Sequence, residues 1–166
     1  MKKFLSFVIV LVMLMSLTVT AFAAGSPTVG PGGGDNGDIA VVDPSNPDGP
    51  KVVIPAKAIK TVTIDQADKL LSAEDAKAFK AAYDEAMAME DCKVYKCFWL
   101  FIDEELVGED FPGISENCAL AYKFSCPGEG VKLYVNGNEM KTVKENGKSY
   151  TAYLTELGAV TITCEK

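Results

Sequence analysis

The stretch "KVYKCFWLFIDEELVGED", Lys93 to Asp110, is the most informative about the fold. In it, a long run of apolar residues is followed directly by acidic ones. Side chains alternate between the two faces of an extended strand. One face would carry Tyr95, Cys97, Trp99 and Phe101, and the other Val94, Lys96, Phe98, Leu100 and Ile102. A strand that is apolar on both faces is usually covered on both. We therefore expect a central strand between a second sheet and a helix.

An alternative reading exposes part of this strand as a binding surface. Tyr95 and Trp99 would then form a platform on which sugar rings stack, so these two are the candidate ligand-binding residues. Lys96 interrupts the other face, and its ammonium group could reach solvent at a sheet edge. It could instead form an isopeptide crosslink with a buried asparagine beside a carboxylate.

The acidic end of the stretch offers two kinds of chemistry. Calcium prefers several oxygen ligands from such loops, which makes Asp103, Glu105, Glu109 and Asp110 a speculative Ca²⁺ site. A pair of carboxylates, such as Glu104 with Glu109, could also hydrolyse a glycosidic bond. The simpler interpretation is a solvated acidic loop without a cofactor.

The segment before the central strand has the pattern of an amphipathic helix. Ser72 is a good N-cap, and Asp75 three residues later nearly completes a capping box. Apolar residues recur at helical spacing, at Phe79, Ala82, Tyr83, Ala86 and Met87. The spacing predicts a helix over 73–90 that packs on a sheet, with a partner-binding helix as the alternative.

The rest of the chain, from 93 to 164, reads as short strands. Alternating apolar residues are interrupted by turn signals such as Asn136-Gly137 and Asn146-Gly147, the first being a strong hairpin signal. The inward faces would be formed by Leu120, Tyr122 and Phe124, by Leu133 and Val135, by Tyr150, Ala152 and Leu154, and by Val160 and Ile162. We expect one α+β domain over 52–166, in which one amphipathic helix packs on a mainly antiparallel sheet or sandwich of six to seven strands.

The closing strands, "YTAYLTELGAVTITC", weakly resemble those of bacterial immunoglobulin-like secreted or surface modules. The resemblance rests on the strand pattern of the last seventy or so residues. It departs from antibody-type domains, where a tryptophan lies between two bridged cysteines, because Trp99 follows Cys97 and precedes Cys118. What the resemblance implies is a β-sandwich with an adhesive or spacer role.

The beginning of the chain has the layout of a secretory signal peptide. Lys2 and Lys3 precede an apolar run, and Ala21-Phe22-Ala23 provides small residues for cleavage after Ala23. An uncleaved membrane anchor is the alternative. After the signal peptide, 1–23, the Gly/Pro/Asp-rich segment 24–51 is expected to be a flexible linker. The exported protein would then be secreted and would have no stable membrane anchor.

Composition excludes several classes of function. The formal net charge of −7 would fall to −9 once Lys2 and Lys3 leave with the signal peptide. The chain has neither arginine nor histidine, so the guanidinium contacts typical of nucleic-acid binding are missing. Nucleophiles activated by histidine and zinc sites that use histidine are excluded as well.

Five cysteines follow the signal peptide, which in an exported protein first indicates disulfides with one thiol left over. Cys126 and Cys164 both end strands and both point inward by phase, so they are the first predicted pair. Their bridge would close a loop of about 39 residues and stabilise the fold by roughly 4 kcal/mol. Cys97 with Cys118 is a second, weaker pair. The remaining Cys92 would be a buried thiol, or else a reactive one.

These observations predict a small secreted module of the cell exterior that binds without catalysing a reaction. Its partner would be an extracellular protein or a glycan, and the module would be monomeric. Two alternatives stay open. One is a secreted carbohydrate-active enzyme that uses the acidic residues of 103–110, and the other is a structural spacer at the cell surface.

Overall fold

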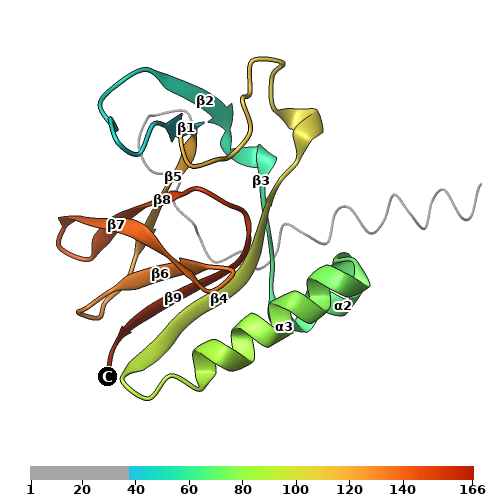
Figure 1. The fold of residues 1–166 in the computed structure, drawn as a ribbon, viewed down its shortest axis with the longest axis vertical. Coiled ribbons are helices and arrows are strands. Elements are labelled where there is room, and N and C mark those ends of the chain that lie inside the picture. Colours follow the sequence, from blue (N-terminus) through green and yellow to red (C-terminus); the bar gives the residue numbers. More distant parts are fainter. Residues whose placement is uncertain (1–37) are drawn as a thin grey trace, which may run out of the picture.

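The computed structural model describes residues 38–166, and the expected signal peptide and the first half of the expected linker lie outside this range. The described chain forms a single antiparallel sheet of nine strands, curled into a nearly closed barrel, with helices on its outside (Figure 1). The strands are β1 Asp38–Val42, β2 Lys51–Pro55, β3 Ile59–Val62, β4 Cys92–Ile102, β5 Ala119–Ser125, β6 Lys132–Val135, β7 Asn138–Asn146, β8 Ser149–Leu154 and β9 Gly158–Glu165.

Hydrogen bonding orders the strands as β2-β1-β5-β8-β7-β6-β9-β4-β3. β7 connects the two halves of this sheet, because Met140 pairs with Leu133 of β6 whereas the next residue, Lys141, pairs with Tyr153 of β8. The sheet bends round at β7 and brings its two halves face to face. The expected α+β class is therefore confirmed, but the sheet has nine strands rather than six or seven and forms a barrel rather than a sandwich.

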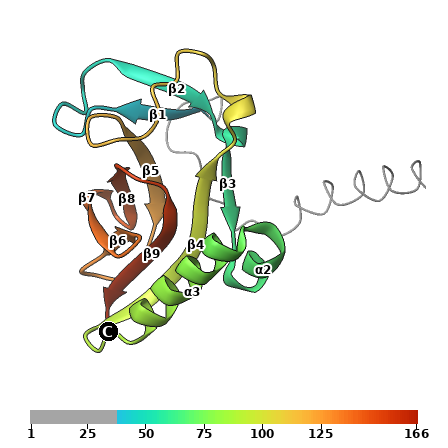
Figure 2. The same cartoon turned by 45° about the vertical axis from the view of Figure 1, so that its right-hand side comes forward.

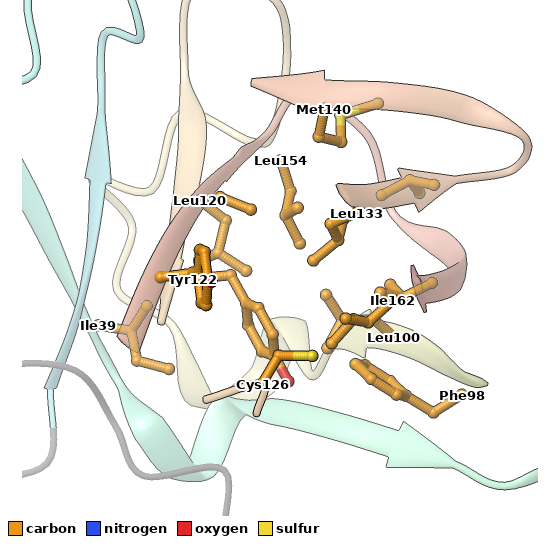
Figure 3. Packing of buried hydrophobic residues seen from close by; sticks show 14 of the residues in the cluster. Ile39, Phe98, Leu100, Leu120, Tyr122, Cys126, Leu133, Met140, Leu154 and Ile162 are labelled. Carbon is orange, nitrogen blue, oxygen red and sulfur yellow. The ribbon is translucent and has the colours of Figure 1, made fainter. Parts of the chain in front are cut away.

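The core fills the inside of the barrel, as Figure 3 shows. Phe98 of β4 and Tyr122 of β5 lie in contact, with ring centroids 6.0 Å apart, although their strands are not hydrogen-bonded neighbours. Phe124 stacks between Tyr122 and Tyr150. The alternation predicted from the sequence is confirmed, because the fully buried side chains include Leu120, Leu133, Val135, Ala152, Leu154, Val160 and Ile162.

The main helix, α3 (Ala73–Met87), lies along the outer face of β4 and β9 (Figure 2). Ser72 is its N-cap: the Asp75 N–H donates to Ser72 Oγ at 3.1 Å, and Ser72 Oγ donates to the Asp75 carboxylate at 2.7 Å. Phe79 is fully buried on the helix face that meets the sheet. The helix ends at Met87 rather than at 90, and Met87 is exposed instead of belonging to the apolar face.

The short helical elements are α2 (Ala67–Leu70) and the 3₁₀ turns η2 (Ala56–Ala58), η3 (Ile64–Gln66) and η4 (Glu104–Leu106). Among residues 38–166, none of the helices has the length and apolar character that a membrane crossing requires.

β4 is covered on both faces, as its sequence predicts. Phe98 and Leu100 are buried inside the barrel, whereas Cys97 and Trp99 pack under α3. The inner cover is the opposite wall of the barrel and not a separate sheet. Phe101, near the end of the strand, is 38 % exposed.

The predicted linker, 24–51, is too long, because its second half contains a strand of the domain. β1 begins at Asp38, pairs with β2 and β5, and buries Ile39, Val41 and Val42. The surrounding glycines, prolines and aspartates made this stretch look too polar to pack. Pairing on both sides allows so short a strand to bury its few apolar side chains.

Candidate functional site

A groove of about 540 Å³ lies on the outer surface of the half-sheet β2-β1-β5-β8-β7. Its floor comes from β1, β5 and β8, and its walls come from β7 on one side and from β2 with the β1–β2 connection on the other. The groove is lined by Ala40, Val42, Pro47, Asp48, Lys51, Val53, Ala121, Lys123, Lys141, Val143, Glu145, Thr151 and Tyr153.

The floor of the groove carries small side chains, which leave space above the sheet. Ala40 and Ala121 lie there, opposite strand positions that point large residues into the barrel. Thr151, which pairs with Lys123 and Val143, is only 3 % exposed. Its Oγ1 is the one buried side-chain oxygen or nitrogen within 38–166 that has no hydrogen-bond partner. Buried hydroxyls are normally paired, so this unpartnered oxygen is an unusual feature of the groove floor.

Tyr153 and Lys141 mark one wall of the groove. Lys141 Nζ lies 5.5 Å from the centroid of the Tyr153 ring, in cation–π geometry. The same ammonium group donates to the Pro44 carbonyl at 2.9 Å, which ties β7 to the β1–β2 connection across two intervening strands. Burial first, and then the nearby Glu145 and Asp48 carboxylates, raise the pKa of the Tyr153 phenol. The phenol therefore stays protonated at neutral pH and can donate a hydrogen bond.

The charges of the groove are mixed. Three lysines, Lys51, Lys123 and Lys141, share it with two acids, Asp48 and Glu145. The lysines can only donate hydrogen bonds and the carboxylates can only accept them. Val53 and Val143 add exposed apolar surface, at 56 % and 40 % exposure. The groove thus offers donors, acceptors, an aromatic ring and aliphatic contacts together.

A second hollow, of about 790 Å³, lies over β6, β7 and β9. Its main charged groups already satisfy each other, because Lys132 Nζ and Glu139 Oε2 form an ion pair at 3.0 Å. It also lacks a buried polar atom that needs a partner. We therefore take the first groove as the candidate site.

The two predicted ligand-binding residues do not lie in this groove. The Trp99 ring is half-buried and packs against Phe79 of α3, with centroids 6.0 Å apart and planes at 57°. Tyr95 is 37 % exposed on β4, and the Lys96 ammonium group lies 5.5 Å from its ring centroid. The structure therefore separates the two rings: one supports the helix and the other faces solvent.

The acidic residues after β4 do not converge on a metal site. Asp103 Oδ1 accepts a hydrogen bond from the Glu105 N–H at 3.3 Å and so caps η4, while Glu105, Glu109 and Asp110 point into solvent. Within residues 38–166, no three carboxylate or thiol side chains are arranged to hold a metal ion. The structure therefore does not bring the predicted calcium ligands together, and the calcium site stays a prediction.

All five cysteines are free thiols in the structure, so neither predicted disulfide is formed. The pairing of Cys97 with Cys118 is wrong, because Cys97 lies under α3, where its sulfur is 3.4 Å from Thr161 Oγ1, whereas Cys118 packs against the barrel core. Cys126 and Cys164 do belong to one buried cluster. Cys92 lies beside Met89, with its sulfur 3.4 Å from the thioether.

Sequence reasoning missed the groove although its residues occupy regular positions. Ala121 and Lys123 on β5, and Thr151 and Tyr153 on β8, are the outward members of the alternation that predicted the core. Small and polar side chains at such positions usually mean a solvated face. A threonine and a tyrosine at alternating outward positions of one strand are the only local signal.

Comparison of the chain with protein-family models, with curated proteins and with solved structures found no match. The immunoglobulin-like resemblance of the closing strands stays a prediction.

Proposed function

We propose that this protein is a small secreted module that binds a neutral oligosaccharide of the cell exterior in the groove between β7 and the β1–β2 connection, without catalysing a reaction. The observation that carries the proposal is the buried, unpartnered Thr151 hydroxyl at the floor of a groove whose walls present both donors and acceptors.

The mixed chemistry of the groove favours a sugar. Sugar hydroxyls donate and accept, so they can use the lysines and the carboxylates at once. A strongly charged ligand of either sign would be repelled by one of the two sets. Tyr153 supplies a ring face and a polar tip, a combination that suits the apolar and hydroxylated sides of a pyranose. The volume lies in the range of small-molecule sites.

Other ligand classes fit the groove less well. A peptide that binds as an added strand needs free backbone groups. The floor strand β8 is paired along one edge by β5 and along the other by β7, so it has none to offer. Nucleic acid needs a positive stripe, whereas Asp48 and Glu145 interrupt the lysines here.

A binding role also fits the placement of the carboxylates. Glycosidases hold two carboxyl groups at a fixed separation on either side of the scissile bond. The acids at 103–110 are spread over an exposed turn, away from the groove. We therefore propose that any polysaccharide is bound and left intact.

The experiment is a screen of the exported protein on an array of neutral and acidic glycans, followed by calorimetry with each hit. We expect neutral oligosaccharides to bind. Tyr153→Ala should weaken binding at least tenfold, because stacking and a hydrogen bond are both lost. Thr151→Val keeps the shape, removes the hydroxyl and should also weaken binding.

Tyr95→Ala is the matched control, because it removes an exposed tyrosine from β4 outside the groove. It should bind as the unchanged protein does. Loss of binding in this variant, with Tyr153→Ala unaffected, would move the site to β4 and overturn the proposed groove. An array without hits would count against a glycan ligand altogether.

Secretion is tested separately, by N-terminal sequencing of the protein recovered from the culture medium. We expect the mature chain to begin at Ala24, since the small residues Ala21 and Ala23 define the cleavage site. An intact chain that begins at Met1 and stays with the cells would contradict the proposed localisation.

A further inference from the structure

Cys126 and Cys164 belong to one buried cluster and lie toward the end of the barrel opposite the β1–β2 connection. Cys126 follows the last residue of β5 and is fully buried, and Cys164 lies near the end of β9 and is 7 % exposed. Their strands are not neighbours, because β8, β7 and β6 separate them in the sheet. Figure 3 shows Cys126 close to Tyr122 and Phe98, inside the same cluster.

Gly128 packs directly against Cys164, two positions after Cys126. A Cβ atom placed on Gly128 would lie 2.4 Å from Cys164 Cβ and 2.6 Å from its sulfur, so only glycine fits over this thiol. Burial raises the pKa of the Cys126 thiol; the Gly128 N–H lowers it through a hydrogen bond, and contact with the Cys164 thiol raises it further. Both sulfurs therefore lie beside the same glycine.

Hydrogen bonds fix the backbone on each side of this pair. The Cys126 N–H donates to the Lys148 carbonyl at 2.9 Å, and the Glu165 N–H donates to the Glu129 carbonyl at 2.9 Å. The Tyr150 hydroxyl donates to the Gly128 carbonyl at 3.4 Å. The segment 126–130 is thus held against the end of β9, beside Cys164.

We propose that Cys126 and Cys164 are a modification site at which a low-molecular-weight disulfide, such as oxidised glutathione, converts the two thiols into a disulfide while the exported chain folds. The Cys164 thiolate attacks one sulfur of the oxidant and releases the first small thiol, with its proton. The Cys126 thiolate then attacks the Cys164 sulfur and releases the second small thiol. The protein loses two electrons and two protons, which the oxidant gains.

The surroundings select this pair from the five cysteines. Cys97 is engaged with Thr161 under α3, and Cys92 lies beside Met89 on the outside of the barrel. The disulfide would join β5 to β9, two strands that share no backbone hydrogen bonds. It would therefore link the two halves of the barrel covalently. This inference is independent of the sugar proposal.

The test refolds the full exported chain with oxidised glutathione and compares it with the chain kept in reductant. We expect a mass lower by two hydrogen atoms, three thiols that remain alkylatable after unfolding, and a single crosslinked peptide pair containing Cys126 and Cys164. The unfolding equilibrium constant should fall by roughly a hundredfold to a thousandfold against the reduced protein.

Cys126→Ala and Cys164→Ala should each abolish the crosslink, whereas the matched variants Cys97→Ala and Cys118→Ala should keep it. If the core variants do not fold, the peptide map of the unchanged protein decides. Five alkylatable thiols after oxidative refolding, or a bridge that uses Cys92, Cys97 or Cys118, would overturn the proposal.

Discussion

At Gly158 the backbone φ is +135°, and the space where a side chain would sit is already filled. A Cβ there would lie 2.3 Å from Asn136 Oδ1. That oxygen accepts the Ala159 N–H at 2.9 Å, while Asn136 Nδ2 donates to Glu156 at 2.8 Å and to the Leu157 carbonyl at 3.0 Å. Asn136 therefore ties the β6–β7 turn to the start of β9, and this tie requires a glycine.

Gly158→Ala should lower the free energy of unfolding by about 2–4 kcal/mol, from backbone strain together with displacement of the Asn136 side chain. Urea unfolding measures the loss. Gly137→Ala is the control, because Gly137 has φ +85° but open space around its missing side chain. The free energy of unfolding of this variant should fall by only about 1 kcal/mol. Equal losses in the two variants would contradict the role given to Asn136.

Residues at turns were partly predictable. The pair Asn136-Gly137 indicated a hairpin in which both residues have positive φ, and the structure confirms it with φ of +49° and +85°. The need for glycine at position 158 comes from Asn136, twenty-two positions away in the chain, so no local sequence pattern predicts this need. Thr151 was missed for a similar reason, because its lack of a partner depends on the two strands that flank it, β5 and β7.

Among the helices and strands, α3 has one end that the sequence predicts and one that it does not. Its start was predicted, because Ser72 and Asp75 carry the chemistry of a cap. Its end was not, since the stretch after Met87 has no glycine and no proline to stop a helix. There the chain leaves the helix so that β4 can begin at Cys92 and pair with β9.

Ser72→Ala should lower the free energy of unfolding by about 1 kcal/mol, because the Asp75 N–H loses its acceptor. The change is measured as a lower urea midpoint with an unchanged slope. Ser125→Ala, at an exposed strand end, is the matched control and should leave the midpoint within about 0.5 kcal/mol of the original stability. No difference between the two variants would mean that the cap contributes nothing.

The strands were predicted better than their arrangement. Alternation identifies which side of β5, β6, β8 and β9 faces the core. It gives no information on which strands pair. The neighbours of β9 are β4 and β6, and those of β5 are β1 and β8, which are contacts between distant parts of the chain.

For the whole molecule, the buried phenol of Tyr122 makes stability depend on alkaline pH. Burial raises the pKa of Tyr122 above its usual value of about 10. The folded state therefore keeps a proton that the unfolded chain gives up, so stability is intact below about pH 10 and falls as pH rises further. The buried thiols of Cys97 and Cys126, whose pKa is raised as well, act in the same direction.

Tyr122→Phe should therefore flatten the decline of stability above about pH 10, where the unchanged protein loses stability steeply. Urea midpoints measured from pH 7 to pH 11.5 test this. Tyr95→Phe, at an exposed tyrosine, should follow the unchanged protein throughout. A decline of the same steepness in Tyr122→Phe would show that the Tyr122 phenol does not drive the alkaline transition.

The position of β9 between β4 and β6 has a consequence for biosynthesis. A nascent chain that still lacks the residues from Gly158 onward has two unpaired strand edges and an open core, so it cannot complete its fold on the ribosome. For the export proposed above, this means that the chain would stay in a form that a translocation channel can thread until its C-terminal strand has crossed the membrane.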